Sequence, residues 1–216
     1  MTAFSHIILA SASPRRKQLL EQAGIPFVVR PSDVDEDRLT PPDPSPPAVV
    51  RHLAMAKARA VAPLLADQPG ALILGADTAV VLEGEMLGKP AGEEEAARML
   101  SRLAGRTHTV YTALALVGAG GREQAAYAAT RVTMRPMSPQ LLAAYIATGE
   151  PMDKAGAYGI QGFGSMLVER IEGCYFNVVG LPLALLAQML EDWNIDLPRL
   201  WRAASGRQRP ERGGVR

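Results

Sequence analysis

Two adjacent arginines follow a turn of small residues near the N-terminus, in Ala10-Ser-Ala-Ser-Pro-Arg-Arg16. Ser13-Pro14 predicts the start of a helix, because serine favours the N-cap and proline the first helical position. Backbone N–H groups at a helix N-terminus bind anions, so Arg15 and Arg16 could clamp a phosphate there. A surface turn with both arginines in water fits these residues equally well. The Gly-x-x-x-x-Gly-Lys pattern of a Walker loop is absent.

A second candidate is Asp77, which follows the apolar run 71–76. We expect a strand to end just before this acid, at the carboxyl edge of an α/β sheet, where ligands bind. Asp77 could then hold a metal ion or act as a general base for water. An Asx turn that closes the strand is the alternative.

Lysine is rare in this chain, which has four lysines and nineteen arginines. Lys57 and Lys89 are candidates for phosphate binding, because an ammonium group is a compact point charge. For Lys57 a solvated position on its helix is an equal alternative. Residues 149–162 form a long glycine-rich segment of the kind that is usually functional, and the Gln161 amide suits reading a base edge. A structural loop that needs positive φ is the alternative there.

The hydrophobic pattern predicts the elements that position these residues. We expect strands at about 7–10, 27–30, 71–76, 107–117, 123–134 and 166–172, and helices at about 14–23, 48–65, 93–103, 139–148 and 181–193. This alternation, with a hairpin in the middle, predicts the α/β class: a mixed central sheet flanked by helices around a single core. We expect one domain over residues 1–201 and a disordered, Arg/Gly-rich tail over 202–216.

Composition excludes several classes of protein. The 216 residues carry a net charge of +1, which does not suit a general nucleic-acid binder. No apolar run approaches the ~20 residues of a membrane span, and the chain begins without a signal-peptide pattern. We therefore expect a cytoplasmic protein with neither nucleic-acid nor membrane partners. Cys174 is the only cysteine, which excludes a disulfide framework, and we expect it to be buried.

Eight segments, in order, resemble motifs of the Maf family of nucleoside triphosphate pyrophosphatases, and the resemblance spans residues 9 to about 190. The segments are 9–16, 34–36, 53–58, 75–78, 88–90, 108–112, 150–162 and 177–182. Within the family, residues 153–162 are similar to the branch that acts on dTTP and UTP and differ from the branch that acts on 7-methyl-GTP. Cys174 and Met134 depart from the family pattern.

The resemblance implies an inosine-triphosphatase-like fold, a divalent cation (Mg²⁺ or Mn²⁺) and a homodimer. It also implies hydrolysis of dTTP, UTP and modified pyrimidine triphosphates between the α- and β-phosphates. By resemblance, Asp77 is the proton acceptor and Arg15, Thr78 and Gln161 occupy specificity positions. The remaining positions bind substrate (Ser11, Ser13, Arg16, Lys57 and Lys89) or metal (Glu36 together with Asp77). The sequence leaves open which acid is the base and which the metal ligand.

Two other functions are alternatives to this one. The family has been linked to septum formation, so the alternative is a non-catalytic, nucleotide-binding regulator of cell division. The complete set of acids and cations favours an enzyme, because a binding protein needs no carboxylate to activate water. A phosphotransferase is disfavoured by the missing Gly-rich lysine motif.

Overall fold

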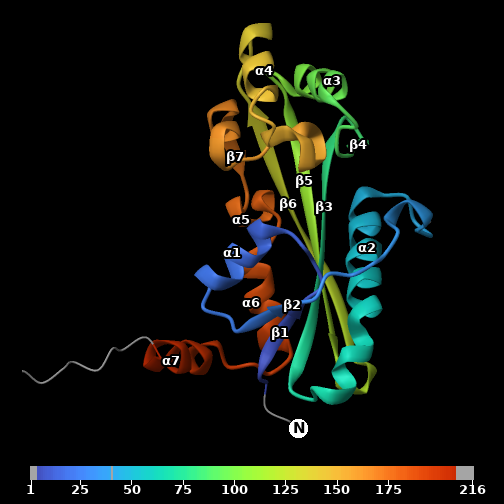
Figure 1. The fold of residues 1–216 in the computed structure, drawn as a ribbon, viewed down its shortest axis with the longest axis vertical. Helices are drawn as coiled ribbons and strands as arrows, with labels where there is room; N and C mark the ends of the chain where they lie inside the picture. Colours follow the sequence, from blue (N-terminus) through green and yellow to red (C-terminus); the bar gives the residue numbers. More distant parts are fainter. Residues whose placement is uncertain (1–3, 40, 208–216) are drawn as a thin grey trace, which may run out of the picture.

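A seven-stranded mixed sheet forms the centre of the computed structural model, which describes residues 4–39 and 41–207 (Figure 1). The strand order is β2-β1-β3-β5-β6-β7, with β4 paired to β3. Strand β1 is parallel to β2 and β3, and the remaining pairs are antiparallel. The strands are β1 His6–Leu9, β2 Phe27–Val29, β3 Ala71–Leu82, β4 Glu85–Leu87, β5 Thr107–Gly118, β6 Glu123–Met134 and β7 Val168–Glu172. The predicted mixed α/β class is confirmed.

Helices cover both faces of the sheet. They are α1 Pro14–Gln22, α2 Pro46–Val61, α3 Glu93–Leu103, α4 Pro139–Ile146, α5 Tyr175–Val179, α6 Leu183–Asp192 and α7 Leu197–Arg207. The short helix α5 was not predicted. Helix α7 contains the first residues of the predicted tail, whereas 208–216 lie outside the described residues. None of the helices in the described part of the chain has the length and hydropathy needed to span a bilayer.

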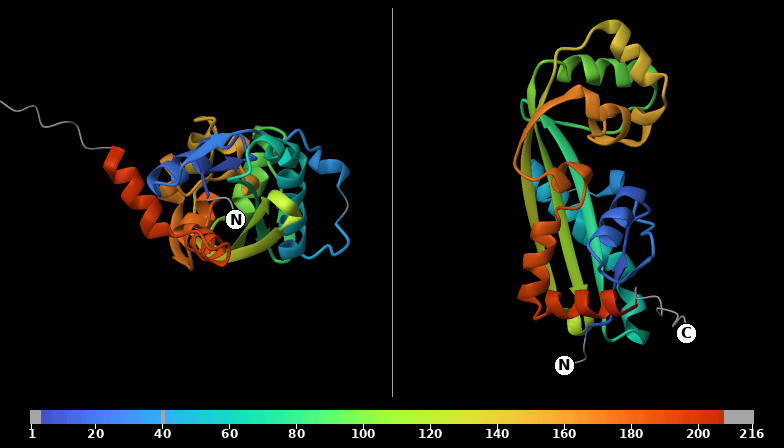
Figure 2. Two further views of the ribbon diagram at one scale, coloured as in Figure 1. Left: turned by 90° about the horizontal axis from the view of Figure 1, so that it is seen from below. Right: turned by 90° about the vertical axis from the view of Figure 1, so that its left-hand side faces the viewer.

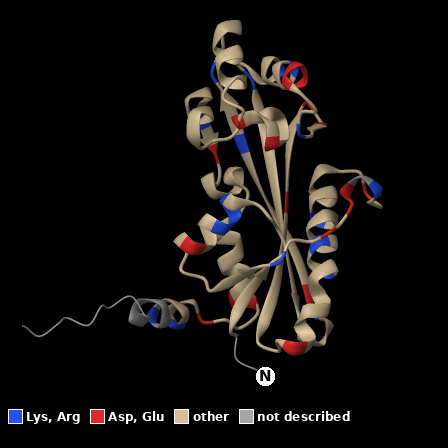
Figure 3. Ribbon diagram, viewed as in Figure 1, with Lys and Arg blue, Asp and Glu red and all other residues tan. Residues whose placement is uncertain are grey.

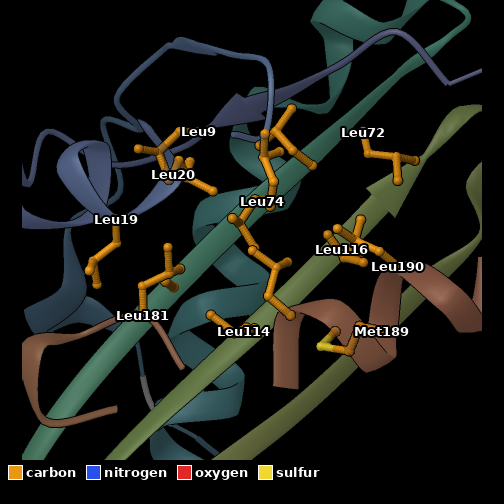
Figure 4. Packing of buried hydrophobic residues seen from close by; sticks show 14 of the residues in the cluster. Leu9, Leu19, Leu20, Leu72, Leu74, Leu114, Leu116, Leu181, Met189 and Leu190 are labelled. Carbon is orange, nitrogen blue, oxygen red and sulfur yellow. The ribbon is translucent and has the colours of Figure 1, made fainter. Parts of the chain in front are cut away.

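The buried side chains form three clusters along the sheet, where the sequence predicted one core. At one end, α1 and α6 pack on β1, β3 and β5 through residues such as Leu20, Leu74 and Leu190 (Figure 4). Helix α2 covers the opposite face of these strands. At the other end, α3 and α4 enclose the third cluster. Figures 1 and 2 show why the apolar residues divide in this way: β3, β5 and β6 run the length of the molecule, and separate helices cover each end.

Strand β3 continues through Asp77, so the prediction that it ends before this acid is wrong. The apolar residues 79–82 extend the strand to Leu82, where it still pairs with β4. The neighbours on one edge of β3 change instead: β1 pairs with it up to Leu74, and β4 from Val80 onward. Over the intervening residues 75–79, that edge has no partner strand among the described residues. This gap, and not a strand end, creates the opening beside Asp77.

Gly75 lets helix α2 lie unusually close to β3. A Cβ at this position would lie 2.1 Å from the carbonyl oxygen of Ala54, far inside van der Waals contact. Side chains alternate along a strand, so Gly75 and Asp77 face the same helix. The close packing therefore brings Lys57 of α2 to the Asp77 carboxylate.

Candidate active site

A cavity of about 1130 Å³ lies along the open edge of β3. Figure 3 shows basic residues on α1 and α2, the helices on either side of this opening. All the residues that the sequence singled out line it: Ser11, Ser13, Arg15, Arg16, Glu36, Lys57, Asp77, Thr78, Lys89 and Gln161. The volume is slightly above the range of about 300–1,000 Å³ that is usual for small-molecule sites, and it suffices for a nucleotide.

Lys57 joins two carboxylates at the bottom of the cavity. Its Nζ lies 2.6 Å from Oδ1 of Asp77 and 2.9 Å from Oε1 of Glu36. The Lys57 and Asp77 side chains are 11% exposed, so the surface alternative for Lys57 is excluded. Glu36, in the 3₁₀ turn Glu36–Arg38, remains about half exposed at 48%. The arrangement holds one buried carboxylate and one accessible carboxylate around a single ammonium group.

Burial raises the pKa of the Asp77 carboxyl above its ordinary value, while the charge and hydrogen bond of Lys57 oppose the rise. A carboxylate with a raised pKa is a stronger base than one in water. Asp77 therefore has the environment of a general base. It lies within the strand, so the Asx-turn alternative is excluded.

Arg16 is held by neutral oxygen atoms. It donates to the Gly180 carbonyl (2.9 Å), Ser11 Oγ (3.0 Å) and Thr78 Oγ1 (3.2 Å), and its pKa is lowered by burial. Within the described residues no carboxylate forms an ion pair with it. A guanidinium has five N–H groups, and three are used here. Two N–H groups and a full positive charge are thus left for an anion.

Arg15 differs from Arg16 because it contacts a carboxylate. Its Nη1 lies 3.2 Å from Oδ2 of Asp153, whose other oxygen lies 2.6 Å from Nζ of Lys154. Asp153 and Lys154 both line the cavity. They belong to the glycine-rich segment 149–162, but the sequence predicted no role for either. The partner of Arg15 lies 138 positions away, so no local pattern could have revealed it.

Glu150 holds the loop that carries Gln161. Its carboxylate accepts hydrogen bonds from Tyr145 Oη and from the backbone N–H groups of Phe163 and Gly164, each at 2.9 Å. Burial raises the pKa of this carboxyl, but the hydrogen bonds lower it by more, so the net shift is downward. The loop thus has an anchor as well as glycines with positive φ, such as Gly162 at +64°.

The remaining predicted residues have simpler surroundings. Ser13 is the N-cap residue of α1, but its side chain makes no capping hydrogen bond; its N–H donates to Ser11 Oγ at 3.2 Å. Lys89 is exposed at the rim of the cavity. Cys174 is half-buried and not fully buried as predicted, since it begins the short helix α5 near the surface.

The cavity is less cationic than the sequence indicated. Its lining holds five basic side chains but also four carboxylates. Three of the carboxylates pair with Lys57, Arg15 or Lys154. Of the five basic side chains that line the cavity, Arg16 and Lys89 make no ion pair within the described residues. A polyanion would bind there first and then compete with Asp153 for Arg15.

The two carboxylates around Lys57 also fit a divalent cation. In the part of the chain that the structure describes, no group of three or more His, Cys, Asp or Glu side chains could hold a metal. Mg²⁺, however, commonly takes one or two carboxylates and completes its shell with substrate phosphates and water. Asp77 and Glu36 suit a cation that arrives with a phosphorylated ligand.

Comparison with known proteins agrees with these features. Residues 6–193 match the family model described as "Maf-like protein". A dTTP/UTP pyrophosphatase of Moorella thermoacetica is 55% identical over 196 residues, which cover 89% of this chain and 97% of the relative. A dTTP/UTP pyrophosphatase of Symbiobacterium thermophilum is 53% identical over 184 residues, 85% of this chain and 92% of the relative.

A solved nucleoside-triphosphatase / dITP/XTP pyrophosphatase from Mycobacterium abscessus aligns with 67% of this chain and 95% of its own, at 17% identity and a TM-score of 0.39. This likeness is too low to bear on the fold or the site. The family model, in contrast, spans most of the chain, and the alignments cover 97% and 92% of the two relatives. The chain belongs to the Maf family.

Proposed function

We propose that this protein is a nucleoside triphosphate pyrophosphatase that hydrolyses dTTP and UTP, and modified pyrimidine triphosphates, between the α- and β-phosphates. Water attacks the α-phosphorus, the bond to the bridging oxygen breaks, and a nucleoside monophosphate and pyrophosphate leave. The observation that carries the proposal is the buried Asp77 carboxylate beside Lys57 in a nucleotide-sized cavity. The activity in the names of the relatives, at 53–55% identity, supports the substrate.

Asp77 takes the proton from the attacking water. Its raised pKa makes the carboxylate a better proton acceptor, and the charge and hydrogen bond of the Lys57 ammonium favour its ionised form. As the phosphates enter, Lys57 can exchange one carboxylate for a phosphate oxygen. We assign the base role to the more buried acid, Asp77, and the accessible Glu36 contributes to holding a cation only.

The other basic groups bind the triphosphate. Arg16 presents two unused N–H groups, Lys89 lies at the rim, and Arg15 becomes available once a phosphate displaces Asp153. Fixed cations of this kind neutralise the charge of the triphosphate and hold it in place. The serines of the turn, Ser11 and Ser13, shape the wall behind the arginines.

Glu36 and Asp77 would hold the divalent cation, Mg²⁺ or Mn²⁺. The bound cation would neutralise phosphate charge and polarise the phosphoryl oxygen. Thr78, Gln161 and Arg15 set the substrate specificity. We place the reaction in the cytoplasm and the protein in a homodimer, with a small-molecule triphosphate as ligand.

A nucleotide panel tests the proposal. The purified protein with Mg²⁺ is incubated with dTTP, UTP, other triphosphates and 7-methyl-GTP, and pyrophosphate release is measured. We expect release from dTTP and UTP; release from none of them would refute the function, and release mainly from 7-methyl-GTP would reassign the branch.

Asp77→Asn tests the mechanism. This change keeps the side-chain volume and removes the base, so we expect turnover to fall by about 10²-fold or more. Asp67→Asn, in an exposed turn far from the cavity, is the matched control and should leave turnover unchanged. Full activity in Asp77→Asn would show that the base is misassigned. A division phenotype that survives the same change would favour the regulator.

A further inference from the structure

Two buried side chains outside the cavity lining connect to Arg16 through a chain of hydrogen bonds. Arg16 Nη2 lies 3.2 Å from Thr78 Oγ1, which lies 3.0 Å from Thr112 Oγ1 on the neighbouring strand β5. Thr112 Oγ1 in turn donates to the backbone carbonyl of Asn177 in α5, at 2.8 Å. Thr112 and Asn177 are both 0% exposed, so neither can contact a ligand in the cavity.

The direction of every bond in this chain follows from the number of protons. A hydroxyl group has one proton to donate, and a carbonyl oxygen can only accept. The Thr112 proton is committed to the Asn177 carbonyl, so Thr112 must accept the proton of Thr78. Thr78 in turn can only accept from Arg16, which carries donors and no acceptor. Every hydrogen bond in this series therefore donates in the same direction, from Arg16 inward to the Asn177 carbonyl.

The chain closes into a ring through the end of α5. The Asn177 carbonyl also accepts the N–H of Gly180 at 3.1 Å, and the Gly180 carbonyl accepts Arg16 Nε at 2.9 Å. Gly180 adopts φ +116°, a conformation that favours glycine, and this residue ends the helix. Arg16 is thus held from two sides by one turn of backbone, once directly and once through the two threonines.

Asn177 fixes that turn to the sheet. Its Nδ2 donates to the Val110 carbonyl (2.9 Å) and to Thr130 Oγ1 (3.0 Å). The Val110 carbonyl requires a donor, so the amide orientation is determined. The Oδ1 atom is buried and has no partner among the described residues. The two Nδ2 hydrogen bonds thus hold α5 against β5 and β6.

From this ring we infer that Thr112 and Asn177 are positioning residues, which hold Thr78 and the Gly180 carbonyl so that the Arg16 guanidinium keeps its orientation toward the triphosphate. The inference rests on the proposed function for the identity of the ligand. It gives a role to two motif segments, 108–112 and 177–182, whose side chains are largely outside the reaction. It also restricts Thr78: while the ring is intact, its hydroxyl accepts from a ligand and cannot donate to a phosphate.

Three variants on strand β5 separate positioning from simple packing. Thr112→Val keeps the shape and removes the hydroxyl, whereas Thr112→Ser restores the hydroxyl. Thr107→Val is the matched control, because Thr107 makes a similar hydroxyl pair with Thr133 (2.9 Å) on the exposed end of the same strand. The first readout needs no ligand: hydrogen exchange of the Arg16 Nε–H, followed by ¹⁵N NMR and assigned with Arg16→Lys.

We expect exchange at Arg16 to be about tenfold faster in Thr112→Val and within twofold of the parent protein in Thr112→Ser and Thr107→Val. In turnover assays, Thr112→Val should raise KM for UTP about tenfold and change kcat less than threefold. Unchanged exchange in a folded Thr112→Val, or in Thr112→Ala if the valine variant is unstable, would overturn the inference. A parent protein that releases no pyrophosphate would refute the proposed function, but the exchange rates would still decide the positioning role.

Discussion

The ammonium of Lys57 lies 2.6 Å from the Asp77 carboxylate, and the two side chains are equally buried. Glu36, from a separate turn, reaches the same ammonium at 2.9 Å. One cation therefore contacts two acids, beside the stretch of β3 where β1 no longer pairs with it and β4 does not yet pair with it.

Removal of the Lys57 charge should destabilise the protein and impair turnover together. Lys57→Met keeps the length of the side chain but leaves Asp77 as a buried charge without its partner, which costs about 3 kcal/mol. Urea unfolding measures the loss. Lys17→Met is the control: its pair with Glu21 is exposed and 3.9 Å long, so the change should be below about 0.5 kcal/mol. Equal effects of the two changes would contradict a buried pair.

The pH profile should report Asp77. Burial raises its pKa above the ordinary 3.8, and the base works only when ionised. We therefore expect kcat/KM to fall as pH decreases through this raised pKa. The acid limb of the profile should lie at a higher pH than an ordinary aspartate would give. Lys57→Met should move the limb to higher pH, because the ammonium that favours ionisation is gone. A limb at or below pH 3.8, or one that Lys57→Met does not move, would be inconsistent with Asp77 as the base.

Residue types and spacing predicted most strands and helices and six of the side chains that line the cavity: Arg15, Arg16, Lys57, Asp77, Lys89 and Gln161. The family resemblance added Ser11, Ser13, Thr78 and Glu36. The reason is physical: the arginines at a helix start, the acid after an apolar run and the glycine-rich loop are local patterns. The end of β3 was predicted wrongly because the strand continues by pairing with β4 and β5, and those contacts are not local. Helix α5 has five residues, too few for an apolar periodicity to appear.

The partners within the site could not be predicted from the sequence. Arg15 meets Asp153, and Thr112 meets the backbone of Asn177, across 138 and 65 positions. Such pairs depend on how the sheet brings its loops together. The same holds for the carboxylates that offset the basic groups, which is why the cavity is less cationic than its motif residues indicated.

Glu150→Gln should loosen the loop that carries Gln161. The carboxylate accepts two backbone N–H groups and the Tyr145 hydroxyl, whereas an amide has one oxygen and would present an N–H group to a donor. We expect KM for UTP to rise about fivefold or more and stability to fall by about 1–2 kcal/mol. Kinetics and urea unfolding measure both. Glu169→Gln, on the exposed strand β7, should change neither; a normal KM in Glu150→Gln would remove the anchor role.

His108 should make the protein sensitive to acid independently of catalysis. Its ring is 3% exposed, Nε2 lies 2.7 Å from the Tyr158 hydroxyl, and burial lowers its pKa from 6.5 to about 4. Above pH 6.5 the ring is neutral in both the folded and unfolded chains. As pH falls from 6.5 toward 4, His108 becomes protonated in the unfolded chain but stays neutral in the folded protein. The free energy of unfolding therefore decreases by up to about 3 kcal/mol. His108→Gln keeps a hydrogen-bonding group for Tyr158 but cannot titrate. Between pH 6.5 and 4, the unfolding free energy of the parent protein should therefore fall more than that of the variant. If the difference between the two proteins stays constant with pH, His108 titrates normally.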